Sequence, residues 1–164
     1  MGSWSMIQNS SMDEVGESVK ISLREDFHPD AEFYYHCQFK IYREPYLIWG
    51  KDTWSAILAG CAVYSILVDG RYAGDILLED RGKGTKYIVD FSLLPEYQRM
   101  GIGRAVLERV KKMGKRLTAV TRNETIQFFL KSGFALKRRI KDYYDSGVDG
   151  YYIVCLGKTT EEGL

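Results

Sequence analysis

Near the start of the chain, two stretches mix aromatic or aliphatic residues with charged residues at a spacing close to that of a helix. They span residues 30–43 and 49–58, and Glu44-Pro45 separates them. Apolar positions that recur at this period are typical of one buried helix face. The pattern therefore predicts two short helices with a break between them.

Runs rich in β-forming residues follow these helices. Residues 61–68 and 72–78 are joined through Asp69-Gly70, and Asp-Gly between two such runs is a strong signal for a type I′ hairpin. A turn at Gly82-Lys83-Gly84 then leads into residues 87–94, in which both faces are largely apolar. This last run is predicted to be a central strand that is covered on both sides.

After residue 95 the apolar spacing changes to that of a helix, which is expected to end at Gly114. Its apolar stripe consists of Ile102, Val106, Val110 and Met113. A strand is predicted at residues 117–121, and Asn123 is expected to cap a helix that ends at Gly133. The remaining elements are an extended segment at 134–144, a loop at 146–150 and a final strand at 151–156.

The predicted order is helix, helix, hairpin, strand, helix, strand, helix and two strands. This order indicates an α/β fold, with a mixed and mostly antiparallel sheet flanked by helices in a single domain. We expect that domain to span residues 19–157, with a flexible leader at 1–18 and a flexible tail at 158–164.

The composition agrees with such a domain. The 164 residues are enough for one core, and 45% hydrophobic with 27% charged residues is the balance of an ordinary globular protein. The three cysteines are widely spaced, which argues against a disulfide framework or metal site and favours the cytoplasm. No apolar run approaches the roughly 20 residues of a membrane span, so no membrane partner is expected.

Charge is unevenly distributed although the net charge is only +1. Residues 99–141 carry thirteen Lys and Arg against two acids, whereas residues 1–98 carry nine basic and fifteen acidic residues. A solvated basic face would explain this asymmetry. So would a site for a polyanion, either a nucleic acid or a nucleotide cofactor.

The segment from Leu93 to Arg104 leads from a strand, through a glycine-bearing loop, directly onto an amphipathic helix. Backbone N–H groups at a helix start have no partner within the helix, and the helix dipole places partial positive charge there. Gly101 and Gly103 leave the backbone open to close approach. These features predict a phosphate-binding loop, although the same glycines would also serve a tight helix start.

Two other phosphate-binding loops do not fit these residues. A Walker A motif requires Gly-Lys followed by Ser or Thr, and here Arg104-Ala105 follows Gly103. A dinucleotide fingerprint requires a small residue where Val106 stands, and an acid after the next strand, which residues 118–121 do not supply.

The run Gln98-Arg99-Met100-Gly101-Ile102-Gly103 resembles the acetyl-CoA motif Gln/Arg-x-x-Gly-x-Gly/Ala of the GNAT superfamily of N-acetyltransferases. Residues 88–97 look like the fourth strand and Pro-Glu-Tyr turn of that family. Residues 122–134 are similar to its later helix, which ends in Gly-Phe. The resemblance extends over residues 87–156.

The resemblance implies a GNAT-like domain that binds acetyl-CoA. The pyrophosphate is expected on the backbone from Arg99 to Arg104, and Leu93 is expected to pair with the pantetheine like a further strand. The implied cofactor-binding residues are Leu93, Leu94, Arg99, Met100, Gly101, Ile102, Gly103, Arg104, Asn123 and Phe129. The nucleotide explains the basic segment, and a nucleic-acid partner is disfavoured because no aromatic residues are interleaved between Arg104 and Arg116.

Members of this family transfer the acetyl group directly to an amine, which must first lose its proton. The sequence departs from the family pattern at both proton-transfer positions. The family glutamate is matched by Tyr87 or Val89, and the family tyrosine by Phe129. The nearest acid is Asp90, a candidate base whose side chain is expected on the opposite face of a regular strand, where it could instead be a polar anchor.

The residues around Tyr143-Tyr144 resemble the hairpin of protein N-terminal acetyltransferases, in which tyrosines line the acceptor slot. Both tyrosines are therefore candidate substrate-binding residues, and Tyr144 is also a candidate catalytic residue. At least one ring should face the cleft between the strands at 87–94 and 117–121. The alternative is that both rings cover the edge of the sheet.

The predicted function is acetyl transfer from acetyl-CoA to a primary amine, on a peptide N-terminus or on a small molecule. A non-catalytic acyl-CoA-binding module is the main alternative, because Val89 and Phe129 stand where the base and acid are often found. The residues do not identify the acceptor, and they leave the oligomeric state open, with a dimer among the alternatives.

Overall fold

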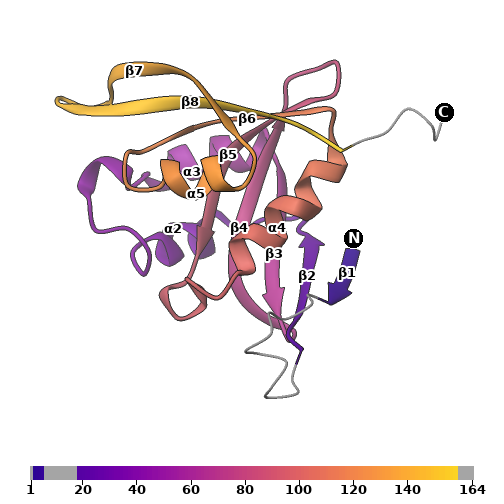
Figure 1. Ribbon diagram of the computed structural model, residues 1–164. Coiled ribbons are helices and arrows are strands. Elements are labelled where there is room, and N and C mark those ends of the chain that lie inside the picture. The colour runs from indigo at the N-terminus through magenta and orange to yellow at the C-terminus, as the bar shows by residue number, and fades with distance from the viewer. Residues whose placement is uncertain (1, 6–17, 159–164) are drawn as a thin grey trace.

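The computed structural model describes residues 2–5 and 18–158 (Figure 1). One eight-stranded sheet, with strand order β1-β2-β3-β4-β5-β6-β8-β7, runs through the described part of the chain. Its strands are β1 (Gly2–Ser5), β2 (Lys20–Glu25), β3 (Ala62–Val68), β4 (Arg71–Asp80), β5 (Thr85–Leu93), β6 (Arg116–Thr121), β7 (Ala135–Asp145) and β8 (Val148–Leu156). The helices are α2 (Ala31–Gln38), α3 (Lys51–Ala59), α4 (Ile102–Val110) and α5 (Ile126–Lys131).

Neighbouring strands are antiparallel except β5 and β6, which are parallel, so the predicted mixed and mostly antiparallel sheet is confirmed. The β3–β4 turn also has the expected geometry. Asp69 and Gly70 both have positive φ, at 50° and 82°, as a type I′ turn requires. The β5–β6 connection contains α4, which is the crossover that a parallel pair needs.

Several boundaries differ from the sequence predictions. Strand β2 was not predicted, although its buried Ile21 and Leu23 alternate with more exposed residues as they should in a strand. Strand β1, which pairs with β2, lies in the expected flexible leader, and residues 6–17 of that leader are outside the described residues. Of the predicted tail, Lys158 is described and residues 159–164 are not.

The helix predicted at 30–43 stops at Gln38. Its start is as expected, because the Asp30 side chain accepts a hydrogen bond from the Glu32 N–H. At its end, the Gln38 amide donates to Trp49 O (2.7 Å) and accepts from Trp49 N (2.9 Å), which ties the two ends of the α2–α3 connection together. That connection contains the 3₁₀ helix η1 (Pro45–Leu47).

Near the other end of the described residues, the prediction of a loop at 146–150 is wrong, because β8 already begins at Val148. Asp145 pairs with Val148, so only Ser146-Gly147 form the turn between β7 and β8. Gly147 has a φ of 77°, which glycine adopts without the steric cost of a Cβ atom.

Two apolar clusters lie on opposite faces of the sheet. The larger one packs the stripe of α4 and the inner residues of α5 against alternate strand residues, among them Ile76 and Ile88. The smaller one packs Tyr34 of α2 and Trp54 of α3 against Val63 and Leu77. Helices α4 and α5 therefore cover one face, and α2 and α3 cover the other (Figure 1). None of the helices within the described residues is long and apolar enough to cross a membrane.

Two irregularities in β5 determine where the site forms. The register places Leu77 opposite Asp90 but Leu78 opposite Ile88, so Val89 is an extra residue, a β-bulge. Beyond Ile88, β5 also separates from its parallel partner, because the last β5–β6 pair is Ile88 with Ala119. The sheet is thus split between the second half of β5 and the second half of β6.

Candidate active site

A groove with a volume of about 970 Å³ occupies this split in the sheet. Its walls come from the second half of β5, the end of β6, the loop before α4, one face of α5, the α2–α3 connection and Tyr144 of β7. Backbone groups along the separated parts of β5 and β6 cannot pair with each other there. Unpaired strand backbone of this kind can bind an extended molecule as an additional strand.

One end of the groove has the geometry of a phosphate-binding loop. Helix α4 begins at Ile102, and the preceding loop contains two residues with positive φ, Arg99 at 61° and Gly101 at 80°. The Gln98 amide donates to Leu93 O (2.8 Å) and so holds this loop against the end of β5. A Cβ atom at Gly103 would lie 3.1 Å from the Phe128 ring, so this position has little room for a side chain. The open backbone, the start of α4 and two arginines fit a pyrophosphate.

Six of the ten predicted cofactor-binding residues line the groove: Leu93, Arg99, Gly101, Gly103, Arg104 and Phe129. The side chains of the other four lie elsewhere. Ile102 is in the core, and Leu94 is buried, with its N–H bonded to Ala73 O (2.8 Å). Met100 is exposed outside the groove, and Asn123 is exposed in the turn before α5.

The prediction that Asn123 caps the later helix is also wrong. Helix α5 starts at Ile126, and Thr125 occupies the cap position. The hydroxyl groups of Thr125 and Thr121 lie 2.5 Å apart and share a hydrogen bond. The cap lies two residues later than predicted, because the chain first makes a turn in which Thr125 N and Ile126 N both donate to Arg122 O.

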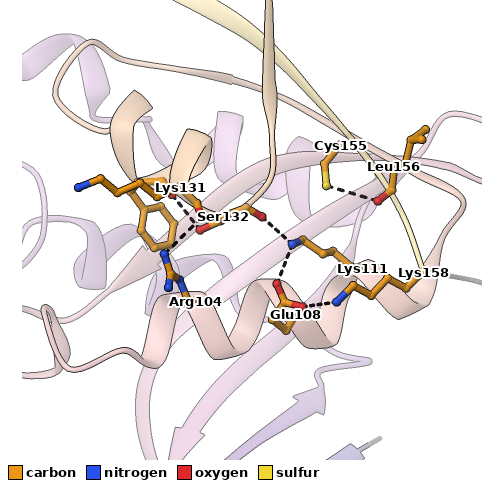
Figure 2. Close-up of polar contacts among 9 residues, drawn as sticks. Arg104, Glu108, Lys111, Lys131, Ser132, Cys155, Leu156 and Lys158 are labelled. Atoms are coloured by element: carbon orange, nitrogen blue, oxygen red, sulfur yellow. Dashed lines mark hydrogen bonds and ion pairs between the residues drawn. The ribbon is translucent and has the colours of Figure 1, made fainter. Parts of the chain in front are cut away.

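Helix α5 is held in place by Arg104 of α4 and by Lys111, the residue that follows the last turn of α4 (Figure 2). Arg104 donates to Lys131 O (3.2 Å), and Lys111 donates to Ser132 O (2.5 Å). Both carbonyls are at the end of α5, where the helix has no internal donors and the dipole is negative. These contacts orient the helix whose Phe128 and Phe129 line the groove.

Asp90 lines the groove on the β5 side. In a regular strand its side chain would point away from the face occupied by Val89, but the bulge at Val89 breaks the alternation. Val89 packs against the cluster formed by α2 and α3, and Asp90 accepts a hydrogen bond from the Tyr42 hydroxyl (3.2 Å) of the α2–α3 connection. The expectation that Asp90 and Val89 lie on opposite faces of β5 is therefore wrong.

A second carboxyl group lies behind Asp90. Asp75 of β4 is only 2% exposed, and the β4–β5 register places it on the same face as Asp90, within hydrogen-bonding reach. Burial raises the pKa of Asp75 well above its ordinary value, and the neighbouring charge of Asp90 raises it further. Burial also raises the pKa of Asp90, although hydrogen bonds from Asp75 and Tyr42 act in the opposite direction.

The two tyrosines of the hairpin are not equivalent. Tyr144 lines the groove, and its hydroxyl donates to Val120 O (3.0 Å), one residue beyond the point where β6 leaves β5. Burial raises the pKa of Tyr144, so the hydroxyl keeps its proton at neutral pH. Tyr143 is 46% exposed, lies outside the groove and packs against Gly150. One ring of the pair thus lies in the split of the sheet, across from Asp90.

The sequence did not point to Arg122 and Tyr42, which line the groove, or to Asp75, which lies behind Asp90. Arg122 forms ion pairs with Glu44 (3.5 Å) and Glu124 (3.7 Å), and so connects the α2–α3 connection with the turn before α5. Tyr42 has no recognisable motif, because its role depends on a residue 48 positions away. Asp75 did carry a signal, since it is an acid inside the apolar run from Ala73 to Leu78.

Comparison with known proteins identifies the class of protein that this fold and groove define. The sequence profile of the acetyltransferase (GNAT) family matches residues 13–134, and the chain therefore belongs to that family. It is an acetyl-CoA-dependent acyltransferase. A search of curated proteins found no significant match.

Solved structures with the same fold include several acetyltransferases. The ribosomal-protein-S18-alanine N-acetyltransferase of Escherichia coli is 18% identical, with a TM-score of 0.71 over 88% of this chain and 98% of that one. A GNAT acetyltransferase of Elizabethkingia anophelis with acetyl-CoA bound is 16% identical, with a TM-score of 0.63 over 83% and 97%. A spermidine N-acetyltransferase chimera from Vibrio cholerae is 13% identical, with a TM-score of 0.67 over 83% and 95%.

Proposed function

We propose that the protein moves the acetyl group of acetyl-CoA directly to a primary amine, either the α-amine of a peptide or the amine of a small molecule. The observation that carries this proposal is the position of Asp90 and Tyr144. They lie on either side of the split between β5 and β6, in the same groove as the phosphate-binding loop. A base and a hydroxyl donor thus flank the place where the acyl group and the amine would meet.

Acetyl-CoA, when bound, supplies a reactive acetyl thioester. Arg99, Gly101, Gly103 and Arg104 would hold its pyrophosphate, and the separated edge of β5 would pair with its extended arm. Phe128 and Phe129 would cover this part of the groove from the side of α5. The described residues therefore provide a complete binding surface between the start of α4 and the split in the sheet.

Asp90 is the proposed base. An amine of the lysine type has a pKa near 10.4 and reacts only after it loses a proton, which Asp90 would accept at its carboxylate. Because burial raises the pKa of Asp90, this carboxylate is a stronger base than an exposed aspartate. Tyr144 would orient the acceptor, and its hydroxyl holds the proton that the leaving sulfur requires.

A peptide α-amine is one of the two acceptor classes, and two observations support it. Tyr144 lies in the groove on a hairpin that resembles that of N-terminal acetyltransferases. The Escherichia coli enzyme with the same fold acetylates an alanine of a ribosomal protein. Small-molecule amines form the other class, and a spermidine acetyltransferase chimera also shares the fold.

The test is thiol release from acetyl-CoA with a panel of peptides with free N-termini, polyamines and amino acids. We expect turnover with at least one amine. Asp90→Asn should lower kcat by roughly 100-fold at neutral pH, with a smaller loss at high pH, where more of the amine is already unprotonated. Asp90→Asn should bind acetyl-CoA as the unmodified protein does. Acetyl-CoA binding without turnover on any amine would favour the non-catalytic acyl-CoA-binding module instead.

A further inference from the structure

Asp75 is a buried acid that the proposed reaction does not use. It lies in the middle of β4 between apolar residues and does not line the groove. A carboxyl group that is 2% exposed is costly unless its oxygens are hydrogen-bonded or it is neutral. The hydrogen-bond partners of Asp75 therefore have to offset the cost of burying its carboxyl group.

The contacts of Asp75 form one chain of hydrogen bonds that ends in the groove. The Tyr72 hydroxyl donates to Asp75 Oδ2 (2.8 Å), and the Ser92 hydroxyl lies 3.5 Å from Asp75 Oδ1. The β4–β5 register places Asp75 and Asp90 on the same face of neighbouring strands, with their carboxyl groups within hydrogen-bonding reach of each other. The Tyr42 hydroxyl donates to Asp90 Oδ1 (3.2 Å). Of the two carboxyl groups, only Asp90 lines the groove.

Two carboxyl groups in hydrogen-bond contact cannot both be ionised at low cost, so they titrate as a pair that shares one proton. The more deeply buried member, Asp75, holds this proton, and Asp90, at the groove, carries the negative charge. Other titratable or charged groups also interact with the pair. They are Tyr34 and Cys37 on α2, Tyr42, Cys61, Tyr72 and Tyr144, and Arg122 in turn interacts with Tyr42 and Tyr144.

We propose that Asp75 is a positioning residue for the amine-deprotonation step, and this proposal rests on the proposed function. As a neutral carboxylic acid, Asp75 donates a hydrogen bond to Asp90. That bond and the Tyr42 hydroxyl hold Asp90 as a carboxylate at the groove. When the acceptor ammonium gives one proton to Asp90, both carboxyl groups of the pair are neutral and the amine is uncharged.

The first test asks, without any substrate, whether Asp75 is protonated in the folded protein. The thermal stability of the unmodified protein and of Asp75→Asn is followed from about pH 4 to pH 8. A buried acid with a raised pKa stabilises the fold most below its unfolded pKa, and this contribution is lost as the pH rises towards its folded pKa. The melting temperature of the unmodified protein should therefore fall relative to that of Asp75→Asn as the pH rises. Parallel curves would contradict a proton held at Asp75.

The second test measures catalysis with Asp75→Asn and Asp75→Val. Asparagine can still donate to Asp90 and accept from Tyr72, so we expect kcat to fall less than about threefold. Valine has no donor, so kcat should fall at least about 30-fold with an unchanged KM for acetyl-CoA. The acid limb of its kcat/KM profile should move to higher pH, because Asp90 loses a hydrogen bond that favours its charged form.

Equal activity of the two folded variants would overturn the proposal, and so would an asparagine variant as impaired as Asp90→Asn. If Asp75→Val does not fold, the proposal is still tested by the pH dependence of stability and by the activity of Asp75→Asn. Tyr72→Phe is the comparison variant. It removes the hydroxyl that donates to Asp75 Oδ2 but leaves Asp75 beside Asp90, so kcat should fall less than in Asp75→Val. Because the stability curves need no substrate, failure to acetylate any amine contradicts the proposed function alone.

Discussion

At the scale of single residues, Asp90 owes its place in the groove to one extra residue in β5. Without the bulge at Val89, strict alternation would turn the Asp90 carboxylate towards the face covered by α4 and α5. With the bulge, Asp90 meets the Tyr42 hydroxyl and the Asp75 carboxyl group on the face covered by α2 and α3. Asp90 thus reaches the groove through an irregularity of the strand.

The Tyr144 hydroxyl can be tested by a single substitution. In Tyr144→Phe the ring remains but the hydroxyl bonded to Val120 O is lost, so we expect kcat to fall about 10-fold or the acceptor KM to rise by a similar factor. The KM for acetyl-CoA should not change. Steady-state kinetics with both substrates measure this pattern.

Tyr143→Phe is the matched control, because Tyr143 is the neighbouring tyrosine and lies outside the groove. Its kinetic constants should stay close to those of the unmodified protein. A larger loss in Tyr143→Phe than in Tyr144→Phe would contradict the assignment of the acceptor slot to Tyr144.

At the scale of elements, α5 depends on α4 for its orientation. Lys111 is 6% exposed and bridges Glu108 Oε2 (2.6 Å) and Ser132 O (2.5 Å), while Lys158 reaches the other oxygen of Glu108 (2.5 Å) (Figure 2). These contacts hold the pKa of Glu108 below its ordinary value, with the hydrogen bond from Lys111 as the main cause. The same carboxylate therefore has one buried and one exposed lysine partner.

Lys111→Met should lower the free energy of unfolding by about 1–3 kcal/mol, because it leaves a buried carbonyl without its donor. Lys158→Met removes the exposed partner of the same carboxylate and should cost much less, as surface ion pairs usually do. Chemical denaturation of both variants gives the comparison. Equal losses would show that the buried bridge to α5 adds no more stability than the exposed ion pair.

At the scale of the whole molecule, the groove joins parts of the chain that are far apart in sequence, from Ile41 to Tyr144. Several cations of the basic segment are engaged in contacts within the molecule. Arg104 and Lys111 bind the end of α5, Arg122 pairs with Glu44, and Arg139 pairs with Asp149. The excess of positive charge in residues 99–141 is thus partly structural, which weakens the case for a nucleic-acid partner.

Binding across this groove should stabilise the whole fold. A ligand that binds only the folded protein adds about 2.7 kcal/mol at 100 times its Kd, so acetyl-CoA should raise the melting temperature by several degrees. Gly103→Asp should abolish that increase, because its side chain would meet the Phe128 ring and place a negative charge beside the phosphates. Thermal unfolding with and without acetyl-CoA measures the effect.

The control is Gly60→Asp, since a Cβ atom at Gly60 would approach nothing closer than 3.8 Å and Gly60 does not line the groove. It should keep the full increase in melting temperature. Normal stabilisation of Gly103→Asp by acetyl-CoA would mean that the phosphate site lies elsewhere.

The sequence by itself determined the features that depend on local pattern. The hairpin at Asp69-Gly70, the helix after Gly101 and the glycine-bearing loop before it follow from periodicity and turn chemistry, which act over a few neighbouring residues. The family also followed from the sequence, because its cofactor motif is contiguous. Boundaries were less accurate, since Gln38 ends α2 through contacts with Trp49 that only the folded chain brings together.

The sequence named Asp90 and Tyr144 as candidates, but only the tertiary structure decided what surrounds them. Tyr42, Asp75, Asp90 and Tyr144 come from four separate segments, and no spacing in the chain signals that the fold brings them into one region. The bulge that turns Asp90 arises from the pairing of β4 with β5, and the split that admits Tyr144 arises from the early end of the β5–β6 pairing. Strand register is a property of two segments together, so the residues of one strand cannot specify it.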